Sequence, residues 1–147
     1  MIDPRTQALL QHILRRASRS LLQYVSEAYP WVGQNENDVI GQVRRVIEEE
    51  RQAIEQLARF LRRQHIGLPY LGAYPGTFMS MNYVSLDHLL QVLCDYQRKM
   101  VAELERNHGP VSDPAARAEI DKLLTLARQH AKTLDALAAA HPEVAVK

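Results

Sequence analysis

The sequence predicts an all-α protein in which four helices form a bundle, as a single domain over residues 1–147. Apolar residues recur at steps of three and four along four separate stretches, which is the spacing of an α-helix that buries one face. No stretch alternates apolar and polar residues over the length that a β-strand needs. A chain of 147 residues, 46% of them hydrophobic, is also long enough to bury a core without disulfides.

The first helix is predicted over residues 4–28. Asp3 is expected to cap its N-terminus, and Pro4 suits the first helical position, where a proline loses no hydrogen bond. Residues 29–33, with the sequence YPWVG, are expected to end it, because a residue that precedes proline disfavours the helical conformation. The apolar stripe consists of Leu10, Ile13, Leu14, Ala17, Leu21, Tyr24 and Ala28.

The second helix is predicted over residues 37–65. Asn35 or Asn37 can cap its N-terminus, and Gly67 and Pro69 lie just beyond its end as stop signals. Because only a short link separates the first two helices, they are expected to form an antiparallel hairpin. The apolar stripe consists of Val39, Val43, Val46, Ile47, Ala53, Ile54, Leu57 and Leu61.

A second antiparallel hairpin is predicted from helices over residues 86–107 and 114–140. The first of these is expected to start after Ser85. Asp113 and Pro114 supply the cap and the first helical position of the other. The link between the two helices is again short, which favours antiparallel neighbours.

The link between the two hairpins, residues 67–85, is long and rich in glycine, proline and tyrosine. At roughly 3.3 Å per residue it can reach from one end of a bundle to the other. The predicted topology is therefore two antiparallel hairpins joined by a long crossover. Its many large apolar side chains either pack over the bundle or form a subunit interface, where tyrosine, phenylalanine and methionine are enriched. We expect a homodimer or another homo-oligomer.

The composition excludes several classes of protein. The net charge is +1, from 18 Lys and Arg against 17 Asp and Glu, which argues against nucleic-acid binding. No apolar run is long enough to cross a membrane, and residues 1–11 lack the apolar core of a signal peptide. The single Cys94 fits a reducing compartment, so we expect a cytoplasmic protein. Arginines outside the apolar stripes are expected to pair with interleaved glutamates on solvent-facing sides.

Glu50 is the most informative residue of the sequence. At 3.6 residues per turn it falls at the centre of the second helix's apolar stripe, whereas Glu48 and Glu49 project sideways toward solvent. A carboxylate in a core needs a proton, a hydrogen-bonding partner or a cation. Two interpretations remain open: a carboxylate hydrogen-bonded across the bundle, and a ligand for a metal or a substrate.

Polar residues on the other helices can meet Glu50. Gln97 lies in the stripe of the third helix, and His130 lies at the edge of the stripe of the fourth. Ser20 and Tyr24 face inward on the first helix. If these residues share one layer, Glu50, Gln97, His130 and Tyr24 form a buried polar network.

The segment EEERQAIEQLARFLRR, residues 48–63, resembles the second helix of ferritin-like and rubrerythrin-like proteins. In that superfamily a Glu-x-x-His motif supplies ligands to two irons. The resemblance places the motif glutamate on Glu50 and its histidine on Ala53. On the fourth helix it places the histidine on His130 and the glutamate on Ala127, and the third-helix glutamate falls on Gln97.

The resemblance thus implies a ferritin-like four-helix bundle that lacks most of its metal ligands. A di-iron site uses four carboxylates and two histidines, but the first helix presents Ala17 and Ser20 in its inward stripe. We expect no di-iron activity, no catalytic residue and no cofactor, and a function by self-association or partner binding. The alternative is a single-metal-binding protein or metal-dependent enzyme that holds one Fe, Mn or Zn ion on Glu50, His130 and Gln97.

Overall fold

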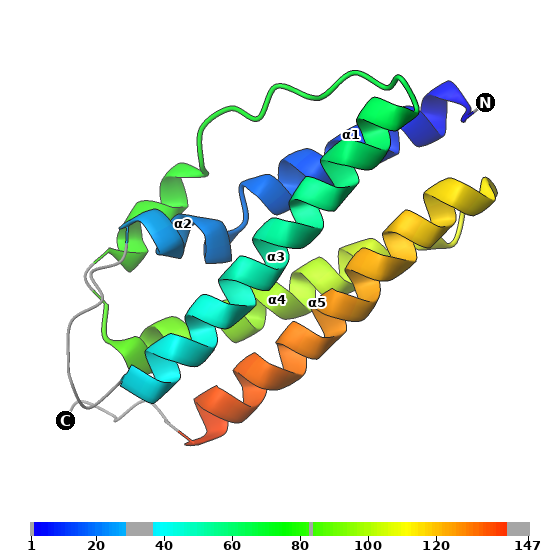
Figure 1. Cartoon of the computed structure of the whole chain (residues 1–147). Helices are drawn as coiled ribbons and strands as arrows, with labels where there is room; N and C mark the ends of the chain where they lie inside the picture. The colour runs from blue at the N-terminus through cyan, green and yellow to red at the C-terminus, as the bar shows by residue number, and fades with distance from the viewer. Residues whose placement is uncertain (1, 29–36, 83, 141–147) are drawn as a thin grey trace.

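The computed structural model describes residues 2–28, 37–82 and 84–140, and these ranges contain helices but no strand (Figure 1). The elements are α1 (Pro4–Ser18), α2 (Leu21–Ala28), α3 (Asn37–Arg63), the short 3-10 helix η2 (Gly76–Met81), α4 (Leu86–His108) and α5 (Pro114–Ala140). The all-α prediction is confirmed. None of the described helices is both long and apolar enough to cross a bilayer.

The helices lie side by side as two hairpins (Figure 1). α1 and α2 together run antiparallel to α3, and α4 runs antiparallel to α5. The crossover returns along α1, so α4 starts at the same end of the molecule as α3. α3 packs against α1, α2 and α5, and α4 packs against α5 and α2. All of these helices therefore surround one shared core.

The predicted single helix over residues 4–28 is wrong, because the chain forms two helices with a break at Arg19 and Ser20. Arg19 leaves the helical conformation, with φ −113° and ψ 29°. The backbone N–H of Gln23 then donates to Ser20 Oγ at 3.2 Å, so that Ser20 caps α2. The apolar period does not reveal the break, since Ala17 and Leu21 remain four residues apart across it.

The predicted helix starts at Asp3, Ser85 and Asp113 are confirmed by capping hydrogen bonds. Each side chain accepts from the backbone N–H three residues later, at 3.1 Å for Asp3, 3.2 Å for Ser85 and 2.9 Å for Asp113. The predicted end of the first helix at residues 29–33 and the predicted cap at Asn35 lie outside the described residues.

α3 ends at a Schellman motif in which His65 takes the left-handed position, with φ 56°. The backbone N–H of Ile66 donates to the carbonyl of Leu61 at 2.9 Å, and that of His65 donates to the carbonyl of Arg62 at 3.0 Å. Ile66 is buried, as the apolar residue of this motif usually is. The helix therefore ends two residues before the predicted boundary.

Side chains of α1 hold the crossover against the bundle. Three donors spaced four residues apart, two on α1 and one at its C-cap, reach three backbone carbonyls of the crossover. They are Gln11 Nε2 to Gly67 at 2.7 Å, Arg15 Nε to Tyr70 at 2.9 Å and Arg19 Nε to Gly72 at 2.7 Å. Farther along the crossover, Phe78 is buried in the core. Arg15 and Arg19 were expected to pair with glutamates, as Arg51 does with Glu48, but they anchor this segment instead.

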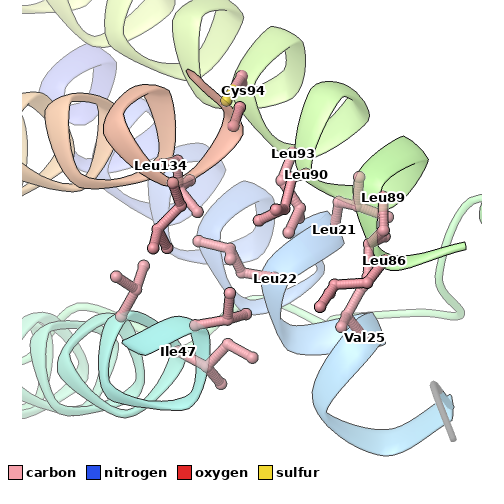
Figure 2. Packing of buried hydrophobic residues seen from close by; sticks show 14 of the residues in the cluster. Leu21, Leu22, Val25, Ile47, Leu86, Leu89, Leu90, Leu93, Cys94 and Leu134 are labelled. Carbon is pink, nitrogen blue, oxygen red and sulfur yellow. The ribbon is translucent and has the colours of Figure 1, made fainter. Parts of the chain in front are cut away.

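The core consists of two apolar clusters with a polar layer between them. One cluster joins α2, η2, the beginnings of α3 and α4 and the end of α5 (Figure 2). The other joins α1, the ends of α3 and α4 and the beginning of α5. Each of three helices passes from one cluster to the other through a buried polar residue: Glu50 on α3, Gln97 on α4 and His130 on α5.

We predict that His65→Gly stabilises the protein by about 1 kcal/mol, or roughly 3 °C in Tm. Glycine adopts the left-handed conformation without the steric cost that an L side chain carries there. Thermal and urea unfolding would measure the change. His65→Ala is the matched control, since it also removes the imidazole but keeps a Cβ; equal stability of the two variants would contradict the explanation.

Candidate functional site

Glu50 is buried in the centre of the bundle, with 6% of its surface exposed. Its Oε1 accepts a short hydrogen bond from Ser20 Oγ and a second one from Gln23 Nε2 at 3.1 Å. Both donors are themselves buried. Of the two interpretations of Glu50, hydrogen bonding to a neighbouring helix is therefore confirmed for its oxygen Oε1.

The break between α1 and α2 places these donors. Ser20 caps α2 with the same hydroxyl oxygen that donates to Glu50, so one side chain both starts the helix and satisfies the carboxyl group. Gln23 lies one turn further along α2, and its amide also donates to the carbonyl of Ile47 at 3.1 Å. α2 is thereby tied to α3 at Glu50 and at Ile47, which lies one turn before it.

Burial raises the pKa of Glu50 from the usual 4.5 to about 7, although the hydrogen bonds from Ser20 and Gln23 act in the opposite direction. At neutral pH the carboxyl group is consequently divided between its protonated and ionised forms. Its charge can change in a pH range where an ordinary glutamate stays ionised.

A cavity of about 30 Å³ lies beside Glu50. This volume is enough for one or two water molecules, given that a single water needs roughly 10–15 Å³ on the same measure. Its polar lining includes Glu50, Gln97 and His130. The apolar lining consists of Ile13, Ala17, Ala53, Met100, Leu104, Leu123, Leu126 and Ala127.

Gln97 crosses from α4 to α5. Its Nε2 donates to the carbonyl of Ala127 at 3.1 Å, and the residue is 1% exposed. Its Oε1 is buried without a hydrogen-bond partner among the described residues. The lining of the cavity therefore includes an unsatisfied acceptor, which a small donor would satisfy.

His130 lies at the edge of the cavity, and its Nε2 is 3.5 Å from Oε1 of Glu49. The imidazole is 3% exposed, and Nε2 forms no hydrogen bond within the described residues. Burial lowers the pKa of His130, and the nearby Glu49 carboxylate offsets this effect only in part. The ring is thus predominantly neutral at pH 7.

Arg16 and Glu103 form an ion pair that also lines the cavity. Arg16 Nε donates to Glu103 Oε2 at 2.7 Å, and Arg16 Nη1 donates to the hydroxyl of Tyr96 at 2.9 Å. His12 Nε2 lies 3.2 Å from the other Glu103 oxygen. Burial raises the pKa of Glu103, but the bonds to Arg16 and His12 outweigh it and hold the pKa below its usual value. This carboxylate therefore stays ionised and neutralises a half-buried arginine.

The structure brings most of the predicted site residues together. Glu50, Gln97 and His130 line one cavity, although no hydrogen bond among the described residues joins any two of them. Tyr24 is not part of this layer, because its hydroxyl donates to Asn82 Oδ1 at 2.6 Å. The sequence interpretation missed Gln23. Its signal was the Ser-x-x-Gln spacing of a capping box, which starts at Ser20.

The donor set does not fit a di-iron centre. Among the residues that the structure describes, no group of three or more His, Cys, Asp and Glu side chains is placed to hold a metal ion. Burial also raises the pKa of the Cys94 thiol to about 11, so it is not a thiolate at neutral pH. The cavity can therefore bind small polar groups, but its own side chains do not assemble a multinuclear metal site.

We predict that Glu50→Gln makes stability less dependent on pH. Because the pKa of Glu50 is near 7 in the folded protein and 4.5 in the unfolded chain, Glu50 favours folding most below about pH 4.5. This contribution to stability is lost as the pH rises through 7. The difference between the two pKa values corresponds to about 3 kcal/mol. Glutamine keeps the acceptor for Ser20 and Gln23 but does not titrate.

Urea unfolding at about pH 5 and about pH 8.5 would test this prediction. When the pH is raised from about 5 to about 8.5, the free energy of unfolding of Glu50→Gln should increase by roughly 2–3 kcal/mol relative to that of the wild type. Glu48→Gln makes the same chemical change at an exposed position and is the control. If this relative increase in the free energy of unfolding is no larger in Glu50→Gln than in Glu48→Gln, the carboxyl group of Glu50 is not desolvated.

Comparison with known proteins finds no family model that matches this chain, and no curated protein or solved structure that matches it. The functional interpretation consequently depends on the residues and contacts described above.

Proposed function

We propose that the chain is a ferritin-like four-helix bundle that has lost di-iron chemistry and acts by binding, either to a second copy of itself or to another protein. It is not assigned a catalytic residue. The proposal depends on the cavity beside Glu50, on the connectivity of the helices and on the surface of the crossover.

The composition of the cavity wall carries the proposal. The resemblance to ferritin-like proteins assigned metal-ligand positions to five residues on α3, α4 and α5, and all five line this cavity. They are Glu50, Ala53, Gln97, Ala127 and His130, and Ala17 from the inward stripe of α1 lines it as well. This convergence of residues far apart in the sequence supports the assignment.

The connectivity is compatible with the same family. Two antiparallel hairpins are joined by a crossover that runs the length of the bundle (Figure 1). Ferritin-like bundles differ from simple up-and-down bundles by one such long connection.

The side chains that remain argue against oxygen chemistry on two irons. Two of the five assigned positions are alanine, and Gln97 offers a neutral amide in place of a carboxylate. Glu50 directs Oε1 to Ser20 and Gln23, while Nε2 of His130 lies near Glu49. Glu50 and His130 thus have different partners, and these contacts do not favour the alternative of a single ion held by both residues.

The crossover supports a binding function. Among the described residues, its large apolar side chains include the exposed Leu68, Tyr70 and Met79, with 45%, 84% and 66% of their surfaces accessible. The backbone beneath Tyr70 is fixed by Arg15, so this surface is presented on an anchored segment. Tyrosine and methionine are enriched in protein interfaces. We therefore place self-association on this face.

Restoring the missing ligands tests the assignment of the cavity. We predict that Ala17→Glu, Ala53→His, Gln97→Glu and Ala127→Glu together create a site that retains about two Co²⁺ or Fe²⁺ ions per chain after gel filtration. The wild type, purified without chelators, should retain no stoichiometric iron or manganese. Elemental analysis and the visible spectrum of Co²⁺ would measure binding.

The control is the restored variant with Glu50→Gln added, which should lose metal. Four buried polar groups can prevent the apo form from folding, so refolding is followed by circular dichroism with and without Co²⁺. A restored variant that folds and retains no cobalt would contradict the assignment. So would a wild-type protein that carries two irons.

Self-association predicts that the wild type sediments with the mass of a dimer or a larger oligomer. The variant Leu68→Ser/Tyr70→Ser/Met79→Ser should shift toward the monomer, because these side chains are exposed in the single chain and contribute little to its own packing. Analytical ultracentrifugation over a range of concentrations would measure the shift. The control is Ser80→Ala, an exposed change on the same segment.

An unchanged Tm in the triple-serine variant would separate loss of association from unfolding. A wild type that remains monomeric at all concentrations would contradict self-association and leave a different protein as the partner. An oligomer that the triple substitution does not weaken would exclude the crossover as its interface.

A further inference from the structure

One end of the bundle presents arginines that have no ion-pair partner. α1 and α5 begin at this end, and α3 and α4 finish there (Figure 1). All of the arginines concerned are exposed, and none of them forms an ion pair or a side-chain hydrogen bond with another described residue. This surface, the basic end, consists of Arg5 on α1, Arg62 and Arg63 on α3, and Arg106 on α4.

The sequence around Arg62 and Arg63 explains why these two arginines remain unpaired. A partner on the same helix would lie three or four residues away, and no acidic residue stands at those positions. Arg59 stands there instead, and its guanidinium already binds Glu55 at 2.9 Å. The expectation that arginines pair with interleaved glutamates is therefore wrong for Arg62 and Arg63, which face a like charge one turn away.

Helix stability does not account for the whole basic end. Positive charge is favourable at the C-terminus of a helix and unfavourable at its N-terminus. Arg62, Arg63 and Arg106 lie in last turns, but Arg5 lies in the first turn of α1. The repulsion among unpaired cations that different helices bring to one surface is a cost that an anionic partner would remove.

Acidic side chains of the same end are already engaged. Asp3 and Asp113 cap α1 and α5, where the positive end of the helix dipole offsets their charge. Further acids pair with basic side chains of their own: Glu55 with Arg59, Glu105 with Arg128, Glu119 with Lys122 and Asp121 with His108. Within the described part of the chain, the arginines of the basic end are therefore left without a counterpart.

We propose that the basic end binds an acidic segment of another protein. Each guanidinium offers a planar pair of N–H donors that matches a carboxylate. A second copy of this chain does not fit, because a two-fold contact at this end would oppose the same arginines. A long run of phosphates is also disfavoured, since the net charge of the chain is only +1 and two aspartates stand at the same end.

The basic end differs from the surface to which self-association is assigned, because it includes none of Leu68, Tyr70 and Met79. The inference rests on the proposed function only in that the chain acts by binding a protein. It does not require the chain to associate with itself.

Fluorescence anisotropy of a fluorescein-labelled oligoglutamate peptide, titrated with the full chain, tests the proposal. We expect saturable binding that weakens when sodium chloride is raised from about 50 mM to about 200 mM. The affinity should fall at least about fivefold in Arg62→Gln/Arg63→Gln, because two charge-assisted hydrogen-bonding groups are lost. Arg62→Lys/Arg63→Lys keeps the charge and should recover part of this loss.

The matched control is Lys99→Gln/Lys132→Gln, which removes the same charge from exposed positions on α4 and α5 away from the basic end. Its affinity for the peptide should stay within about twofold of the wild type. An equal loss in this control would overturn the proposal, because binding would then follow net charge alone. A wild type that does not bind the peptide would overturn it as well.

Two further measurements separate the alternatives. Tighter binding of the wild type to a short RNA duplex or to phosphatidylserine vesicles than to the peptide would contradict an acidic protein as the partner. Analytical ultracentrifugation distinguishes the inference from self-association. A monomeric wild type that binds the peptide would contradict self-association and support the basic end, whereas an oligomer that ignores the peptide would do the reverse.

Discussion

The need to keep one carboxyl group satisfied away from water determines the centre of this molecule. Glu50 projects from α3 into an apolar core, where an unpartnered carboxylate is strongly unfavourable. A continuous first helix would direct the Ser20 hydroxyl to its own backbone. The break at Arg19 and Ser20 instead lets this hydroxyl cap α2 and donate to Glu50, and it places Gln23 alongside. The break in the first helix thus supplies the donors that the buried carboxyl group needs.

The same layer divides the core and contains its cavity. Glu50, Gln97 and His130 interrupt the apolar stripes of three helices at one level, and alanine occupies neighbouring positions. Polar side chains restrict apolar packing, and small side chains leave space, so a void at this level is expected. Protonation of Glu50 near neutral pH reduces the cost of burying it. The layer consequently combines a weakly packed region with a group whose charge depends on pH.

Local signals predicted most of the fold, and contacts distant in sequence determined the rest. The helical period and the caps at Asp3 and Asp113 depend on neighbouring residues and could be predicted from the sequence. The inward position of Glu50 could be predicted for the same reason. The role of Ser20 depends on Glu50, which is 30 residues away. The hydrogen bond from Arg15 to the crossover likewise joins segments that are distant in sequence, and a periodic pattern of apolar residues does not predict such a contact.

Two adjacent glutamates on α3 lie in different surroundings. One step along a helix turns a side chain by about 100°, so Glu50 enters the core whereas Glu49 reaches a groove between α3 and α5. His130 stands at the boundary and touches both environments. Its Nε2 lies near the carboxylate that solvent can still reach. The position of a residue along a helix sets the direction of its side chain, whereas its partner depends on the charges and hydrogen bonds within reach.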